Sequence, residues 1–167
     1  MSGPTEPGPV VEGFKVLFVC TGNTCRSPTA EAIARAQVQA RGWHAVEVRS
    51  AGTSAFSGAP ASGGAVRAAR RGGLDISDHR STPLTPEVVA WADLILTMSA
   101  HHAQSALAMG GGDRTALLTA FASGAGEEET PVPDPFGRAD AEYEATFRSL
   151  EDLVYRAFGR LEPIVSP

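Results

Sequence analysis

Two patterns of apolar and polar residues alternate along the chain: short apolar runs, and longer stretches with helical spacing. The first run, from Phe14 to Cys20, is apolar apart from Lys15, as is typical of a strand buried on both faces of a parallel sheet. Helical spacing then extends from Pro28 to Arg41, and Gly42 ends it. Further strands are predicted at 45–49, 92–98 and 114–118, further helices at 61–71, 99–109 and 139–161, and a brief helix at Thr85 to Glu87.

Strands that alternate with helices pair in parallel through right-handed crossovers. The predicted fold class is therefore α/β, a three-layer doubly wound sheet of about four parallel strands with helices on both faces. A chain of 167 residues fits one such domain, which we assign to 14–162. The proline-rich segment 1–13 is expected to be a flexible tail, and 163–167 a short C-terminal tail.

Composition and charge exclude several functions. A content of 43% hydrophobic and 20% charged residues allows a sizeable core. The net charge of −5, without a run of Lys or Arg, argues against nucleic acid as a partner. No stretch resembles a signal peptide or a membrane helix, so we expect no membrane contact and a cytoplasmic location. Two cysteines are too few for a disulfide framework or a structural zinc site, and a reducing compartment suits them. The sequence does not reveal the oligomeric state, and a monomer is the default expectation.

The segment Cys20 to Pro28, directly after the first strand, carries the clearest chemical signal. Gly22 and Asn23 tolerate positive φ, so the loop can curl and direct its N–H groups inward as an anion nest. Arg26 offers a planar fork for two phosphate oxygens, and the following helix adds the positive end of its dipole. We therefore predict that a phosphate binds in the middle of this loop. Its predicted ligands are Thr21, Gly22, Asn23, Thr24, Cys25, Arg26 and Ser27.

The same surroundings favour the thiolate of Cys20 over the thiol, which predicts a nucleophile. Ser27 is the expected N-cap of the helix, and its hydroxyl can also donate to the sulfur. A thiolate that attacks phosphorus needs a partner that protonates the leaving group. Asp134 is the candidate acid, because the prolines around it restrict the geometry of its loop.

Together, the Cys20 to Pro28 segment and the later Asp-Pro-Phe segment resemble the low-molecular-weight protein tyrosine phosphatases, over roughly Phe14 to Leu161. The resemblance implies that Cys20 forms a cysteinyl-phosphate and that Arg26 binds the phosphoryl group. It also implies that Asp134 acts as acid in the first step and as base toward water in the second. Phosphorylated proteins are the implied substrates, with no metal and no cofactor. The residues implied to support the loop by hydrogen bonds are Asn23, Ser27, Ser50 and His79.

Thr24 and Phe136 bear on the substrate class. Tyrosine-directed members commonly carry an aliphatic residue at the position of Thr24, whereas bacterial protein arginine phosphatases of this family resemble the chain in having Thr. Phe136 is also more similar to that branch than to the Asp-Pro-Tyr of many tyrosine-directed members. The chain departs from the branch after Ser-Ala-Gly, where an aromatic residue is missing and Phe56 lies two positions away. Phosphotyrosine and phosphoarginine both stay open, with Thr24 favouring phosphoarginine.

Cys25 has two interpretations. It is either a small buried residue beneath the loop or, as the family suggests, a resolving thiol that closes a reversible disulfide with Cys20. His101 and His102 are expected to be solvated polar residues at the start of a helix.

Three other functions compete with a phosphatase. A non-catalytic phosphate-binding protein would have lost the nucleophile or the acid, and the sequence keeps both. A thiol redox sensor on the same fold is the second alternative. Arsenate reductase is disfavoured because its chemistry needs further cysteines, and none follows Cys25.

Overall fold

The computed structural model describes residues 13–124 and 130–165. It contains a parallel four-stranded sheet in the order β2-β1-β3-β4. The predicted α/β fold class is confirmed. The expected N-terminal tail lies outside the described residues except for Gly13. The strands are β1 Lys15–Cys20, β2 Glu47–Gly52, β3 Leu94–Thr97 and β4 Thr115–Leu117.

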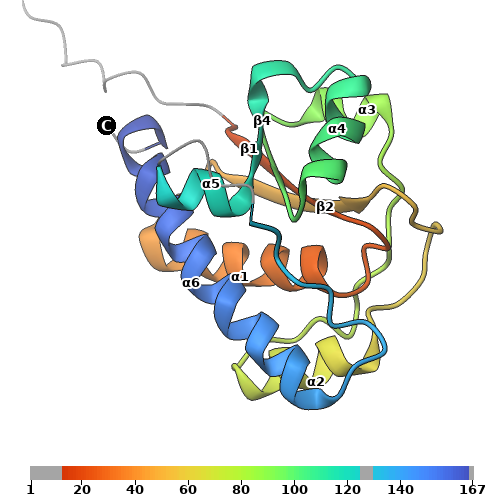
Figure 1. Cartoon of the computed structure of the whole chain (residues 1–167). Helices are drawn as coiled ribbons and strands as arrows, with labels where there is room; N and C mark the ends of the chain where they lie inside the picture. Colours follow the sequence, from red (N-terminus) through yellow and green to blue (C-terminus); the bar gives the residue numbers. More distant parts are fainter. Residues whose placement is uncertain (1–12, 125–129, 166–167) are drawn as a thin grey trace, which may run out of the picture.

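Helices cover both faces of the sheet (Figure 1). On one face lie α1 and α6 with the shorter α2 and α5, and on the other lie α3 and α4. The N-cap Thr85 accepts a bond from the N–H of Val88 at 3.2 Å, so the brief helix begins where the sequence predicted. The helices are α1 Arg26–Arg41, α2 Gly63–Arg71, α3 Pro86–Trp91, α4 Ala100–Ala108, α5 Leu118–Ser123 and α6 Asp140–Val165, with a 3₁₀ turn at Gly112–Arg114.

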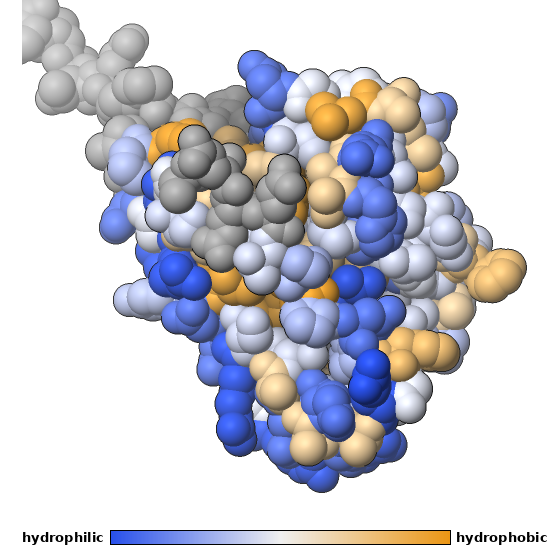
Figure 2. Space-filling view, in the orientation of Figure 1, coloured by the Kyte–Doolittle hydropathy of each residue, from blue (hydrophilic) through white to orange (hydrophobic). Residues whose placement is uncertain are grey.

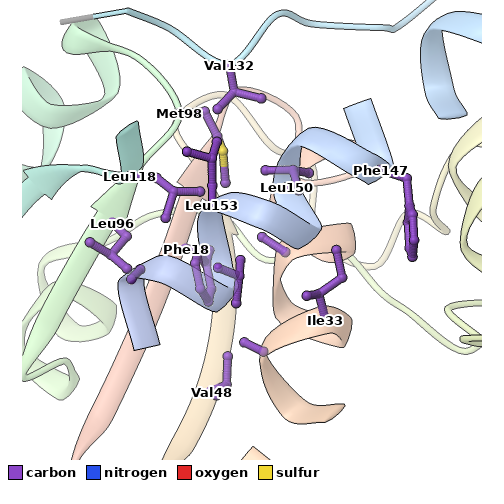
Figure 3. Packing of buried hydrophobic residues seen from close by; sticks show 14 of the residues in the cluster. Phe18, Ile33, Val48, Leu96, Met98, Leu118, Val132, Phe147, Leu150 and Leu153 are labelled. Atoms are coloured by element: carbon purple, nitrogen blue, oxygen red, sulfur yellow. The ribbon is translucent and has the colours of Figure 1, made fainter. Parts of the chain in front are cut away.

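Strand β1 is buried on both faces because its side chains alternate between two apolar clusters. Val16 and Phe18 pack toward α1 and α6, while Leu17 and Val19 pack toward α3 and α4. Figure 3 shows the first cluster, where sheet residues meet side chains of α1 and α6. The continuous apolar run predicted a strand that is buried on both faces, and the structure confirms it. Packing against both clusters holds β1 in place at the start of the loop that follows it.

The coloured part of the face shown in Figure 2 is mostly polar. Hydrophobic residues form small separate patches among hydrophilic ones on the face shown in Figure 2. None of the helices within 13–124 and 130–165 combines the length and apolar character needed to cross a bilayer.

Strand β2 begins later than the 45–49 predicted and extends to Gly52. Ser50 and Gly52 are turn-forming types, yet each residue from Ser50 to Gly52 is paired with β1, ending with Gly52 opposite Cys20. Pairing with the central strand therefore overrides local preference here.

The prediction that Ser27 caps the first helix is wrong. The helix α1 begins at Arg26, Cys25 occupies the N-cap position, and the side chain of Cys25 makes no capping hydrogen bond. The buried Ser27 hydroxyl instead lies 2.9 Å from Cys20 Sγ and 3.4 Å from the carbonyl oxygen of Ala51. The uncapped helix start keeps its N–H groups available for a ligand.

The C-terminal half of the chain differs from prediction in two places. The short helix α5 precedes the predicted loop at 123–133, of which 125–129 lie outside the described residues. Helix α6 continues past the expected end of the domain at 162 to Val165, with Pro163 inside it. Val165 packs partly against the main core, which explains why the last turn stays helical.

Candidate active site

The loop of residues 20–26 leaves the carboxyl end of β1 and leads directly into α1. The carbonyl oxygens of Cys20, Thr21 and Thr24 accept bonds from the N–H groups of Thr53, Ser54 and Ser62, each at 2.9 Å. Because these carbonyls are bonded to residues outside the loop, we infer that the N–H groups of the loop face its interior, as in an anion nest. The curl depends on Asn23, whose φ of 55° is the one positive value at a non-glycine position in the described chain. Gly22, predicted to share that conformation, does not adopt it.

The completely buried side chain of Asn23 ties the loop together. Its Nδ2 donates to Ser27 Oγ at 2.8 Å and to Ser50 Oγ at 2.9 Å, and its Oδ1 accepts from the N–H of Thr82 at 2.9 Å. The carbonyl of Asn23 accepts from His79 Nε2 at 2.7 Å. The structure therefore brings together the four residues that the sequence assigned to loop support.

The directions of these bonds determine where the Ser27 proton lies. Ser50 Oγ donates to the carboxylate of Glu31 at 2.5 Å, so it accepts from Asn23. Ser27 Oγ also accepts from Asn23, which leaves its own proton for one of two acceptors, Cys20 Sγ at 2.9 Å or the carbonyl oxygen of Ala51 at 3.4 Å, and Cys20 Sγ is the nearer. A hydroxyl that donates to sulfur stabilises the thiolate. Glu31, which anchors this chain of bonds, was not identified from the sequence, where it resembles any solvated helix residue.

Arg26 is buried beneath the loop with one unpaired donor. Its Nη1 donates to the carbonyl of Val132 at 3.0 Å, and its Nη2 donates to Thr21 Oγ1 at 3.4 Å and lies 3.6 Å from Asp134 Oδ2. Its Nε has no hydrogen-bond partner among the described residues. A buried donor without an acceptor is costly, and an oxyanion bound in the loop would supply the acceptor.

Asp134 reaches the site from the segment before α6. It lines a cavity of about 260 Å³ together with Cys20 and Arg26. Its side chain is 52% exposed, and Oδ1 accepts from the N–H of Phe136 at 3.0 Å. The structure thus places the predicted nucleophile, anion ligand and acid around one cavity.

Two exposed aromatic residues flank this cavity. Phe136 is 68% exposed and Phe56 is 85% exposed, and both line it. The loop after β2 protrudes at the right in Figure 1, and a hydrophobic patch lies at the same place in Figure 2. Phe56 was not assigned to the site from the sequence, because it lies two positions from where the family branch has an aromatic residue. A single aromatic residue in a Gly/Pro-rich loop close to the phosphate loop was the signal that could have identified it.

Cys25 is buried and its thiol is hydrogen-bonded. Its Sγ lies 3.0 Å from Ser62 Oγ and 4.0 Å from the hydroxyl of Tyr143. Burial raises the pKa of Cys25, so its thiol resists ionisation. Both Cys20 and Cys25 are free thiols in this structure.

The prediction that His102 is solvated is wrong. The ring is completely buried on the inner side of α4 beside Ala103 and Ala106, and burial is the main cause that lowers its pKa to about 4. Helical spacing with Ala106 was the overlooked signal. No cluster of His, Cys, Asp or Glu in the described ranges is placed to hold a metal ion.

Gly52 is expected to be intolerant of any side chain, because a Cβ there would lie 2.4 Å from the carbonyl oxygen of Thr21 and 2.8 Å from the nitrogen of Asn23. Gly52→Ala should therefore lower the free energy of unfolding by about 1–3 kcal/mol and displace the loop. The control is Gly159→Ala in α6, where a Cβ meets nothing within 4 Å. That change should raise stability by about 0.5–1 kcal/mol. Urea denaturation measures both, and equal stabilities would contradict the prediction.

Comparisons with known proteins agree with this geometry. The family model described as low molecular weight phosphotyrosine protein phosphatase matches residues 15–163. A protein-arginine-phosphatase from Geobacillus stearothermophilus is 35% identical over 151 residues, 89% of this chain and 97% of the relative. A crystal structure of a YwlE mutant from Bacillus subtilis has a TM-score of 0.83 at 35% identity, covering 90% of this chain and 99% of that one. A low molecular weight protein tyrosine phosphatase from T. tengcongensis has a TM-score of 0.82 at 38% identity, covering 89% and 100%.

The doubly wound sheet, the cysteine-bearing loop after its first strand and the family match together place the chain in the class of cysteine-dependent phosphatases. The resemblance found in the sequence is confirmed. The chain belongs to the low molecular weight phosphotyrosine protein phosphatase family and is a hydrolase of that type.

Proposed function

We propose that the chain hydrolyses phosphorylated protein side chains in two steps. The Cys20 thiolate attacks phosphorus, the bond to the leaving group breaks, and Asp134 donates a proton to the leaving group. Asp134 then takes a proton from the water that attacks the cysteinyl-phosphate, which releases inorganic phosphate and the thiolate. The inward N–H groups and Arg26 bind the phosphoryl oxygens, and Ser27 stabilises the departing sulfur.

The observation that carries this proposal is the unpaired Nε of Arg26. Most buried donors in proteins have an acceptor. Here the missing acceptor coincides with a ring of inward N–H groups around Cys20, so a single bound oxyanion explains both features. A protein that binds phosphate without turnover would need the same cradle but would not need Asp134 at its rim.

For the substrate class we propose phosphoarginine. Thr24 lines the cavity beside Cys20, and its hydroxyl offers a polar contact to a guanidinium group. Two relatives that align with most of the chain, at 35% and 38% identity, carry the name protein-arginine-phosphatase. The exposed Phe56 and Phe136 favour the alternative, phosphotyrosine, because they can pack against a phenyl ring.

Replacing Thr24 tests the substrate class. Thr24→Ile removes the hydroxyl and adds an aliphatic wall, and we expect the ratio of kcat/KM on phosphoarginine to that on phosphotyrosine peptides to fall about tenfold or more. The control Thr24→Ser keeps the hydroxyl and should keep most of the preference. A ratio that Thr24→Ile leaves unchanged removes Thr24 from specificity. If the parent chain hydrolyses neither peptide and no small aryl phosphate, the proposed phosphatase activity is refuted.

Redox regulation, cellular location and oligomeric state remain predictions from the sequence. We propose that a peroxide oxidises Cys20 to a sulfenic acid with release of water, and that the thiol of Cys25 then displaces a second water to form a disulfide, which external thiols reverse. The two free thiols suit a cytoplasmic location, and a monomer is consistent with a site built from one chain.

A further inference from the structure

His102 is a completely buried histidine with both ring nitrogens hydrogen-bonded. Its Nε2 lies 2.8 Å from Thr21 Oγ1, and its Nδ1 lies 2.9 Å from Ser99 Oγ. Bonds at both ends fix the plane of the ring. An apolar side chain would pack beside Ala103 and Ala106 without the cost of burying two polar atoms. The ring therefore has a purpose beyond filling space.

Thr21 connects this histidine to the anion site. Its hydroxyl is bound by His102 on one side and accepts from Nη2 of Arg26 at 3.4 Å on the other. The same Nη2 lies 3.6 Å from the Asp134 carboxylate. Nη2 carries two N–H groups, so it faces the Thr21 hydroxyl and the Asp134 carboxylate at the same time.

The charge state of His102 suits this position. Burial lowers its pKa to about 4, and the charges of His101 and Arg26 act in the same direction. At neutral pH the ring is uncharged, so it holds Thr21 without placing a second positive charge next to Arg26. A lysine or arginine here would repel the guanidinium it has to position.

We propose that His102 is a positioning residue for the phosphatase reaction: by orienting the Thr21 hydroxyl it fixes Nη2 of Arg26 beside the phosphate loop. When His102 is lost, the Thr21 hydroxyl loses the bond that orients it, and Nη2 of Arg26 loses a fixed acceptor. The oxyanion then loses a fixed donor. The inference rests on the proposed function for its kinetic part, and on phosphate binding alone for the rest.

The test combines four variants in the full chain: His102→Leu, His102→Gln, Thr21→Val and the double variant of Leu with Val. Calorimetry with inorganic phosphate gives affinity, and turnover of an aryl phosphate gives kcat and KM. The matched control is His101→Leu. This exposed neighbour lies 2.8 Å from the same Ser99 hydroxyl, whereas the bond to Thr21 comes from His102.

We expect His102→Leu to weaken phosphate binding and to lower kcat/KM, each by about tenfold. Gln at position 102 has an amide that reaches Thr21, so His102→Gln should recover most of both. The control should match the parent chain. Because His102 acts through Thr21, the double variant should lose no more than Thr21→Val alone.

The proposal is overturned if the double variant loses phosphate affinity by the product of the two single-variant losses. It is also overturned if His102→Leu melts at a lower temperature but binds phosphate like the parent. If His102→Leu does not fold, Thr21→Val alone tests the connection, and a Thr21→Val chain that binds phosphate like the parent overturns the proposal. One outcome separates the two proposals. If the variants show the expected differences in phosphate affinity but the parent chain turns over no phosphate ester, the proposed function is refuted and the role of His102 in phosphate binding stands.

Discussion

Cys20→Ser is expected to abolish turnover and to leave phosphate binding nearly unchanged. A hydroxyl is far less acidic than a thiol, so serine offers almost no anionic nucleophile at neutral pH. Loss of a nucleophile costs roughly 10³–10⁶ in kcat. The cradle itself should persist, because serine fits the buried space of Cys20 and can still bond to Ser27 at the observed 2.9 Å. Initial rates on an aryl phosphate measure the first effect, and calorimetry with inorganic phosphate measures the second.

The second cysteine provides the matched control. Cys25→Ser is the same substitution at a second buried position, beside Ser62. A serine hydroxyl can keep a bond to Ser62, and Cys25 takes no part in the proposed chemistry, so activity should stay within about tenfold of the parent. Equal losses in the two variants would assign the role of Cys20 to loop structure and not to nucleophilic attack.

The anion loop was predictable from sequence because its determinants are consecutive. A buried strand, a residue that tolerates positive φ and a helix start follow one another between Lys15 and Arg26, and their order alone determines where Cys20 and Arg26 lie. Proline around Asp134 similarly marked a constrained loop. That this loop meets the first one depends on the sheet, whose parallel strands bring their carboxyl ends to one edge.

The features of the site that could not be predicted from the sequence depend on contacts between segments that are far apart in the chain. The cap prediction for Ser27 followed local preference, but bonds to Cys20 and Asn23 outcompete the helix end. His102 looks like a solvated residue until α4 is packed against the sheet, and the carbonyl of Val132 carries no signal in residue type at all. Polar residues that serve a site through tertiary contacts resemble surface residues in one dimension.

Asp134→Asn is the second substitution with a large expected effect. The amide cannot donate a proton as a carboxylic acid does, so kcat should fall by about 10² to 10⁴ when the leaving group is poorly acidic, as in phenyl phosphate. The loss should be much smaller for p-nitrophenyl phosphate, whose leaving group departs without a proton. Folding should be preserved, because the side chain is 52% exposed and the amide oxygen can still accept from the N–H of Phe136.

Binding distinguishes the acid role of Asp134 from an electrostatic one. The substitution removes a negative charge that lies 3.6 Å from Nη2 of Arg26, so inorganic phosphate should bind as tightly as in the parent or more tightly. Asp113→Asn, at an exposed position in the 3₁₀ turn, is the matched control and should change neither rate nor binding. Equal fractional losses on the two aryl phosphates would show that Asp134 is not the acid. If Asp134→Asn binds phosphate more weakly than the parent, Asp134 instead contributes by shaping the anion site around Arg26.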